Sequence, residues 1–216
     1  MTLDIRMFTV GAIQENSFLV RASEDAKEAV VVDPGAEAPR FLKALEELDV
    51  TLAGILLTHT HFDHVGAVAE LAEATGAEVW VPELEHELLL KIDEIMGARG
   101  GMFAQFGPFT PYDAEHTVTG GDVVELAGLT FDVVFTPGHS IGHVVYAPQG
   151  HPFLLSGDVL FEGSIGRTDL PGGDHPRLLQ SIAELMERFD PETTVLPGHM
   201  GPTTLGAEAR SNPFLR

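Results

Sequence analysis

Short apolar runs alternate with amphipathic segments along the first half of the chain. Short apolar runs are typical of buried strands, and Asp33-Pro34-Gly35 is one clear end of such a run. Segments with apolar residues three and four positions apart predict helices that cover those strands. The pattern predicts strands at 18–20, 29–32, 52–57 and 78–81, and helices at 37–48, 65–75 and 83–96.

The second half is richer in strands. The pattern predicts strands at 123–126, 129–135, 143–147, 153–155 and 194–196, with one helix at 175–189. No linker or shift in composition divides the chain, so we expect a single domain over residues 1–216. Strands followed by helices, and then strands with one helix, favour an α/β fold of two packed sheets with helices outside.

The segment 97–121 breaks this regular pattern. Its glycines and prolines exclude regular structure over most of its length. It nevertheless carries apolar and aromatic residues, which disordered segments lack: Met102, Phe103, Phe106, Phe109 and Tyr112. Two interpretations are equally favoured, a flap over a cleft and a loop that packs on the core.

The charge of the chain narrows the classes of partner. There are 33 acidic against 12 basic residues, which gives a formal net charge of −21. Such a surface repels polyphosphate and anionic lipid, so we expect neither a nucleic-acid nor a membrane partner. The N-terminus lacks the pattern of a signal peptide and no apolar run is long enough to span a membrane, so a cytoplasmic location is expected.

A cluster of potential metal ligands follows the predicted strand at 52–57. The chain contains no cysteine, so a metal site must use histidine and carboxylate ligands. The residues from His59 to His64 read H-x-H-x-D-H, with Asp63 as the carboxylate. His59 and His61 are two apart in an extended segment, so their rings point to the same side. We expect Asp63 and His64 to begin the next helix.

Three further candidates stand at the ends of other predicted strands. His139 follows Thr136-Pro137-Gly138, Asp158 follows Ser156-Gly157, and His199 follows Pro197-Gly198. A glycine beside each ligand allows a sharp turn and a close approach of the backbone. Because α/β sheets place their sites at strand ends, we expect all these ligands at one rim.

With these motifs, nearly the whole chain resembles the metallo-β-lactamase superfamily. The resemblance implies a four-layer αβ/βα sandwich and two divalent metal ions, zinc first, with iron or manganese as alternatives. It implies that one ion is held by His59, His61 and His139, the other by Asp63, His64 and His199, and that Asp158 bridges them. A hydroxide between the ions would be the nucleophile, and Asp63 is the expected catalytic residue that holds it and receives its proton.

The segment around Arg167 favours one branch of that superfamily. Residues 157–169 and 136–143 resemble glyoxalase II, a group of thioester hydrolases that act on a glutathione thioester. Residues 166–173, G-R-T-D-L-P-G-G, and the ending at 212–215, N-P-F-L, are similar to a short prokaryotic subgroup that lacks the C-terminal helical domain. We therefore expect a small-molecule thioester substrate, with glutathione as one candidate for its thiol, and a monomer or small homo-oligomer. Arg167 could anchor an anionic substrate or form a surface ion pair.

Two other functions stay open. A similar G-R-T-D stretch occurs in persulfide dioxygenases, in which His59, His139 and Asp158 would bind a single iron. The chain could also bind metal without catalysis.

The remaining histidines have simpler interpretations. His143 is expected to support the ligands from a strand, whereas His86, His116, His151 and His175 are expected at the surface. Trp80 and the leucines at 88–90 are expected in the core.

Overall fold

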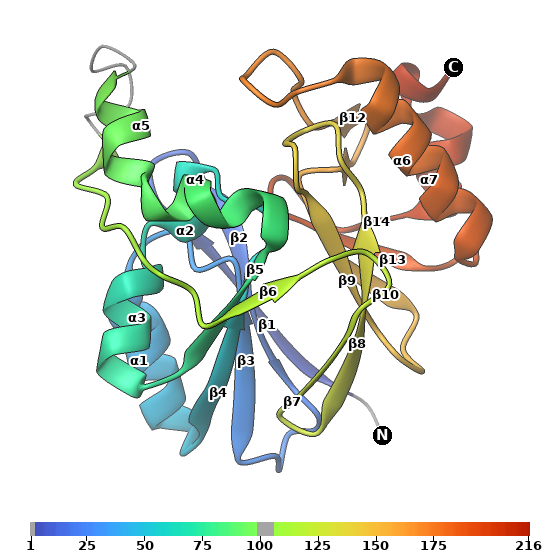
Figure 1. Cartoon of the computed structure of the whole chain (residues 1–216). Helices are drawn as coiled ribbons and strands as arrows, with labels where there is room; N and C mark the ends of the chain where they lie inside the picture. The colour runs from blue at the N-terminus through green and yellow to red at the C-terminus, as the bar shows by residue number, and fades with distance from the viewer. Residues whose placement is uncertain (1–2, 99–105) are drawn as a thin grey trace. The chain divides into compact units, whose positions relative to one another are not determined.

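A computed structural model describes residues 3–98 and 106–216, which form two compact units (Figure 1). The first unit contains residues up to 117 together with 126–129, and the second contains 118–125 together with 130–216. The prediction of one domain over residues 1–216 is not tested by this division and stays a prediction.

The sheet of the first unit places three strand ends at one edge. In the described residues its strand order is β1-β2-β3-β4-β5-β6. Strands β1, β2 and β3 are antiparallel, whereas β3, β4 and β5 are parallel, so the last three have their carboxyl ends on the same side. The strands are β1 Asp4–Val10, β2 Glu15–Arg21, β3 Glu28–Val32, β4 Thr51–Leu56, β5 Glu78–Pro82 and β6 His116–Val118.

The helices of the first unit are shorter than predicted. The helix expected at 65–75 is two helices, because Gly66 packs so tightly on the carbonyl oxygen of Gly35 that a Cβ there would lie 2.3 Å from it. The helix expected at 83–96 consists of three segments. It starts with a 3-10 turn, and non-helical backbone at Lys91 separates the two α-helical segments that follow. The helices are α1 Ala38–Leu48, α2 Phe62–Val65, α3 Val68–Thr75, η1 Glu83–Glu85, α4 His86–Leu90 and α5 Ile92–Ala98.

The run of three leucines in α4 corrects one prediction. Only Leu89 is buried, whereas Leu88 and Leu90 are 38% and 36% exposed. Three consecutive residues of a helix cannot share one face, so the run does not form a core stripe. Trp80 is half-buried and stacks on His116, with ring centroids 4.3 Å apart.

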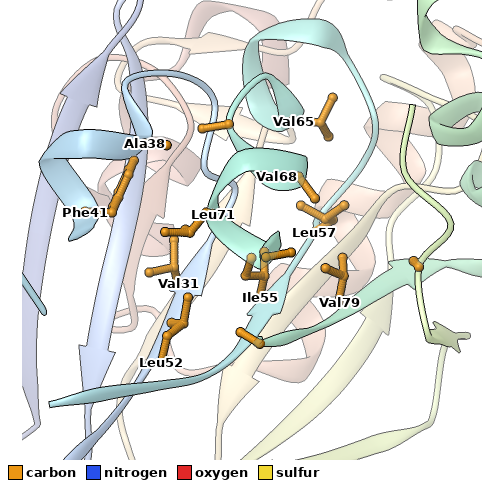
Figure 2. Close-up of a cluster of buried hydrophobic side chains, with 14 of the residues drawn as sticks. Val31, Ala38, Phe41, Leu52, Ile55, Leu57, Val65, Val68, Leu71 and Val79 are labelled. Carbon is orange, nitrogen blue, oxygen red and sulfur yellow. The ribbon is translucent and has the colours of Figure 1, made fainter. Parts of the chain in front are cut away.

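The main core of the first unit lies between the sheet and the helices α1 and α3 (Figure 2). Phe41 of α1 and Leu71 of α3 are fully buried against Val31, Ile55 and Val79 of the three parallel strands. Each of these side chains stabilises the unit by about 1.5–3 kcal/mol relative to an exposed one. The helices therefore pack on residues within β3, β4 and β5, and the residues that follow these strands are left for a site.

The second unit also pairs two strands in parallel. In the described residues its strand order is β14-β13-β10-β9-β8-β7, with β10 and β13 parallel and β8, β9 and β10 antiparallel. A small hairpin, β11–β12, lies between β10 and α6 in the sequence. The strands are β7 Val123–Leu126, β8 Leu129–Phe135, β9 Val144–Pro148, β10 Phe153–Gly157, β11 Leu160–Phe161, β12 Ser164–Ile165, β13 Thr194–Pro197 and β14 Thr203–Thr204.

Helix α6, His175–Arg188, matches the prediction closely. The Asp174 side chain accepts a hydrogen bond from the backbone N–H of Arg177, which caps the first turn. Its apolar stripe, Leu178, Ile182 and Leu185, is buried in the core of this unit. Helices α6 and α7, Leu205–Ser211, contact each other, and the turn η3, Pro213–Leu215, ends the chain.

The irregular segment after α5 packs on the core in part. Phe109 and Tyr112 lie against the main core of the first unit. Burial and a hydrogen bond from its hydroxyl to Glu115 raise the pKa of Tyr112 to about 12. Met102 and Phe103 lie outside the described residues. Among the residues described, no helix has the length and apolar character needed to cross a membrane.

Candidate metal centre

In the first unit, polar side chains gather where β3, β4 and β5 end. Strand register pairs Val32 with Leu56, so Asp33 lies beside the residues that follow β4. The N–H of Asp33 donates to the carbonyl oxygen of Leu56 at 3.0 Å, which extends the ladder to this edge. The H-x-H-x-D-H motif therefore emerges between two neighbouring strand ends, where α/β sheets place their sites.

His59 and His61 were predicted to point to the same side, and their rings lie next to each other. Nε2 of His59 lies 3.1 Å from Nδ1 of His61, and the ring of His59 is fully buried. The two ring nitrogens thus face a common point from the extended segment before α2. This geometry suits two imidazoles that bind one ion.

Asp33 holds the histidines of this edge in place, although the sequence did not single it out. Its carboxylate accepts hydrogen bonds from the N–H of Thr58 at 2.7 Å and from the Thr58 hydroxyl at 2.6 Å. It also accepts from Nδ1 of His64 at 3.0 Å. Because the Thr58 hydroxyl donates to Asp33, its oxygen accepts from Nδ1 of His59, at 3.0 Å. Both rings therefore carry their proton on Nδ1, and the lone pair that can bind a metal ion is on Nε2.

Asp33, His59 and His64 also offer ligand atoms within 4.8 Å of one another. The hydrogen bonds just described account for this proximity, so we interpret Asp33 as the support that orients the two histidines. Asp33 follows a strand and stands next to Pro34-Gly35, as the other candidates stand next to a glycine, but here the glycine comes after the candidate residue.

Asp63 and His64 lie in the first turn of α2, as predicted. Nε2 of His64 is 3.6 Å from a carboxylate oxygen of Asp63, and His64 is fully buried. A second buried carboxyl, Glu15 of β2, approaches Nδ1 of His64 to 3.8 Å. Burial raises the pKa of Glu15 well above its ordinary value. We call His59, His61, Asp63 and His64 the first ligand set.

A further acid fixes Thr60, the residue between the two facing histidines. The Glu85 carboxylate, which is buried beyond the end of β5, accepts from the Thr60 hydroxyl at 2.6 Å and from its N–H at 3.2 Å. Thus the ligand segment that follows β4 is held from both sides, by Asp33 after β3 and by Glu85 beyond β5.

Replacing Gly35 by alanine is expected to displace the ligands of α2. A Cβ at Gly35 would lie 1.6 Å from the backbone oxygen of Asp63, so the helix must move. Overpacking of this kind costs about 1–3 kcal/mol, and metal affinity should fall about 10–100-fold because ligand orientation is lost. Metal titration and urea unfolding measure both effects. The control is Gly97→Ala, since nothing lies within 4 Å of a Cβ there; equal behaviour of the two variants would contradict the prediction.

In the second unit, Asp158 and His199 follow neighbouring parallel strands. Register pairs Gly157 with Pro197, and the N–H of Gly198 donates to the carbonyl oxygen of Gly157 at 2.9 Å. One carboxylate oxygen of Asp158 lies 3.6 Å from Nε2 of His199 and 3.5 Å from Nε2 of His139. A single oxygen between two imidazole nitrogens suits a carboxylate that bridges two ions. We call His139, Asp158 and His199 the second ligand set.

His139 is oriented by the main chain. Its Nδ1 donates to the carbonyl oxygen of Arg167 at 2.8 Å, so Nε2 is the nitrogen that can bind a metal ion. Gly166 allows this approach, because a Cβ there would lie 1.9 Å from the carbonyl oxygen of Asp158 and 3.0 Å from Nδ1 of His139.

His143 supports this set in the way expected. It is fully buried, and its Nε2 accepts the N–H of Asp158 at 3.1 Å. Its Nδ1 must therefore carry the proton and donates to the Thr136 hydroxyl at 3.0 Å. His143 thus positions the backbone of Asp158.

The side chain of Arg167 is engaged at the surface. It forms a two-point ion pair with Asp169, at 2.7 and 2.8 Å, and is 58% exposed. Hydrogen bonding to this guanidinium lowers the pKa of Asp169 to about 2 and raises that of Arg167. The structure thus contains the surface ion pair that was one of the two expectations for Arg167. The guanidinium is nevertheless exposed enough for an anionic group to reach it.

Known proteins share this arrangement of strands and motifs over most of the chain. A family model described as the metallo-beta-lactamase superfamily matches residues 10–199. The chain is 36% identical, over 99% of its length and 98% of the relative's, to a hydroxyacylglutathione hydrolase, GloC, of Haemophilus influenzae.

Two crystal structures resemble the chain throughout. The B3 metallo-beta-lactamase BLEG-1 is 38% identical, with a TM-score of 0.90 over 98% of this chain and 99% of that one. TTHA1623, crystallised in a di-iron-bound form, is 40% identical, with a TM-score of 0.84 over 97% of this chain and 100% of that one. The predicted α/β fold class is confirmed. The chain belongs to the metallo-β-lactamase superfamily.

Proposed function

We propose that this metallohydrolase cleaves thioesters and resembles glyoxalase II in its chemistry. The observation that carries the proposal is the full-length similarity to a hydroxyacylglutathione hydrolase. The two ligand sets would together hold two divalent ions: His59, His61 and His139 for the first, Asp63, His64 and His199 for the second, with Asp158 shared.

The donors of both sets fit such ions. Imidazole nitrogens mixed with carboxylate oxygens suit zinc, iron and manganese. Three rings of these sets, those of His59, His64 and His139, have their second nitrogen engaged by Thr58, Asp33 and the Arg167 carbonyl, as metal-binding histidines generally do. Zinc is our first assignment, and iron is the alternative that the di-iron form of TTHA1623 supports. When bound, the ions supply a water acidified toward a pKa of roughly 7 and a positive charge for the substrate carbonyl.

The chain's own residues then orient the reactants. In this proposal the Asp63 carboxylate orients the attacking water and accepts its proton at a carboxylate oxygen. The proton is then available to the departing thiolate, which needs little assistance because a thiol has a pKa of about 8.5. Asp33 and Glu85 keep the ligand segment rigid while this occurs, since both are buried and hydrogen-bonded to it.

Arg167→Ala is expected to raise KM several-fold for an anionic thioester and to leave kcat little changed. The exposed guanidinium is placed to attract the carboxylates of a substrate, whereas the carbonyl oxygen that holds His139 survives the substitution. Steady-state kinetics with S-D-lactoylglutathione measure both constants. Asp169→Ala is the matched control, because it removes the ion pair but keeps the cation. An unchanged KM in Arg167→Ala would limit this residue to a structural ion pair.

Metal content and substrate turnover together test the function. We expect two ions per chain and hydrolysis of S-D-lactoylglutathione that a chelator abolishes. One iron per chain, with oxygen uptake on glutathione persulfide and no hydrolysis, would instead support a persulfide dioxygenase. Turnover of a β-lactam alone would indicate β-lactamase activity. Bound metal without turnover of S-D-lactoylglutathione, glutathione persulfide or a β-lactam would indicate a metal-binding protein.

A further inference from the structure

A pocket lies within the first unit beside the first ligand set. It has a volume of about 260 Å³ and is lined by residues of the turn between β1 and β2, of the loop after β3, of α2 and of the segment 106–109. Asp63, the proposed catalytic carboxylate, is part of its wall. A group held here would therefore lie next to the reacting centre of the proposed function.

Aromatic side chains form one wall of this pocket. The ring of Phe62, which stands between His61 and Asp63 in the chain, stacks on Phe106 at 5.3 Å and meets Phe109 edge-on at 5.6 Å. A different segment, the turn between β1 and β2, contributes Ile13 to the lining, and this side chain is 40% exposed. An exposed isoleucine and a partly open aromatic cluster are the surfaces that a bound apolar group would cover.

The described lining of the pocket offers no cationic side chain to pair with an anion. Among the described residues that line it, Glu37 and Asp63 are acidic and none is lysine, arginine or histidine. Hydrogen bonds from Arg40 and from the N–H of Gly11 lower the pKa of Glu37, so it stays ionised at neutral pH. A carboxylate held in the pocket would lose its hydration without gaining a cationic partner among these lining residues, a cost that an uncharged group does not carry.

The same contacts make the wall rigid. Glu37 joins the β1–β2 turn to the loop after β3 through its 2.9 Å bond to Gly11. Arg40 extends this link to the carbonyl oxygen of Thr9 at 2.9 Å. The pocket thus exists before a ligand arrives, which reduces the cost of ordering it.

We propose that this pocket binds the acyl group of the thioester and that the preferred acyl group is uncharged and apolar, such as a short alkyl chain or a single ring. This inference rests on the proposed thioester hydrolysis. The volume supports it, since about 300–1,000 Å³ is typical of sites for whole drug-sized ligands and a smaller pocket suits one substituent. Anionic parts of the substrate, such as those of a glutathione thiol, lie outside the pocket.

A series of acyl thioesters of one thiol tests the proposal on the metal-loaded protein. We expect kcat/KM to rise about fourfold for each added methylene from acetyl to hexanoyl, which is the factor for burying one methylene. Succinyl, with a carboxylate at the end of a butyryl-length chain, should be at least tenfold poorer than butyryl. Equal rates for acetyl, butyryl, hexanoyl and succinyl would overturn the proposal while leaving thioester hydrolysis intact.

Ile13→Ala ties the preference to this pocket. The hexanoyl-to-acetyl ratio of kcat/KM should fall at least about threefold in this variant, because part of the apolar wall is removed. Leu84→Ala is the matched control, since Leu84 is also an exposed aliphatic residue, at 54%, and is not part of the lining. A ratio that is the same in both variants would overturn the assignment.

If no thioester is hydrolysed, the proposed function fails and the pocket is tested by binding alone. Hexanamide, a neutral probe, should then shift the backbone amide resonances of Gly11, Ala12 and Ile13 in a saturable manner, and succinamate should not. Absence of shifts with hexanamide would overturn the pocket as an apolar binding site.

Discussion

Asp158→Ala is expected to lower thioester hydrolysis on the order of 10³-fold or more and to leave the protein with fewer than two tightly bound ions. One carboxylate oxygen of Asp158 lies within 3.6 Å of Nε2 of both His139 and His199, so its loss removes the donor that the two ions would share. Without bound metal, water returns to a pKa near ~15.7 and hardly ionises at neutral pH.

Metal analysis after dialysis and initial rates with S-D-lactoylglutathione are the two measurements. Asp25→Ala, at an exposed position, is the control and should match the parent protein in both. Full metal content with a normal rate would remove Asp158 from the ligand set. Full metal content with a lost rate would give Asp158 a role in orienting substrate and contradict its role as a ligand.

Asp33→Ala should destabilise the metal-free protein by about 3–5 kcal/mol. The substitution leaves the N–H and hydroxyl of Thr58 and Nδ1 of His64 without their acceptor, all in the buried edge of the sheet. Asp33 also has a φ of 49°, in the left-handed region, which alanine adopts only with strain. Metal affinity should fall a further 10–100-fold because His59 and His64 lose their orientation.

Urea unfolding of the metal-free protein isolates the first effect, and metal titration measures the second. Asp33→Asn separates backbone strain from lost acceptors, because asparagine tolerates the left-handed region but has one oxygen in place of two. It should unfold with an intermediate free energy and show nearly the same loss of metal affinity. A free energy of unfolding within about 1 kcal/mol of the parent in Asp33→Ala would show that these hydrogen bonds contribute little.

The sequence predicted those parts of the fold in which one periodicity runs for several turns or residues. Helix α6 and strand β8 lie within two residues of their expected bounds because each has one buried face and clear ends. Strand β4 does so because it is a nearly continuous buried run, which the apolar sequence shows directly. The pattern missed β1, whose exposed residues include Met7 at 48%, and the short α7, which has too few turns to show a stripe. It joined α2 to α3 because the break at Gly66 depends on a contact with Gly35, which is distant in the chain.

The ligands were predictable, whereas their supports were not. Seven side chains of two residue types at strand ends form a pattern that a sequence displays directly. Asp33, Thr58 and Glu85 act through hydrogen bonds between neighbouring parallel strands, and pairing of those strands is not visible in periodicity. The pocket around Phe62 was equally hidden, because its lining comes from four separate segments. The shared role of the two ligand sets stays a prediction.

Residue 167 performs one task with its main chain and offers another with its side chain. The peptide carbonyl that fixes His139 is common to every amino acid, whereas the guanidinium is peculiar to arginine. If Arg167 anchors the substrate as we propose, its substitution alters recognition and leaves the hydrogen bond that orients His139 in place. Descendants of such a chain could specialise toward new substrates through this position while inheriting the metal chemistry unchanged.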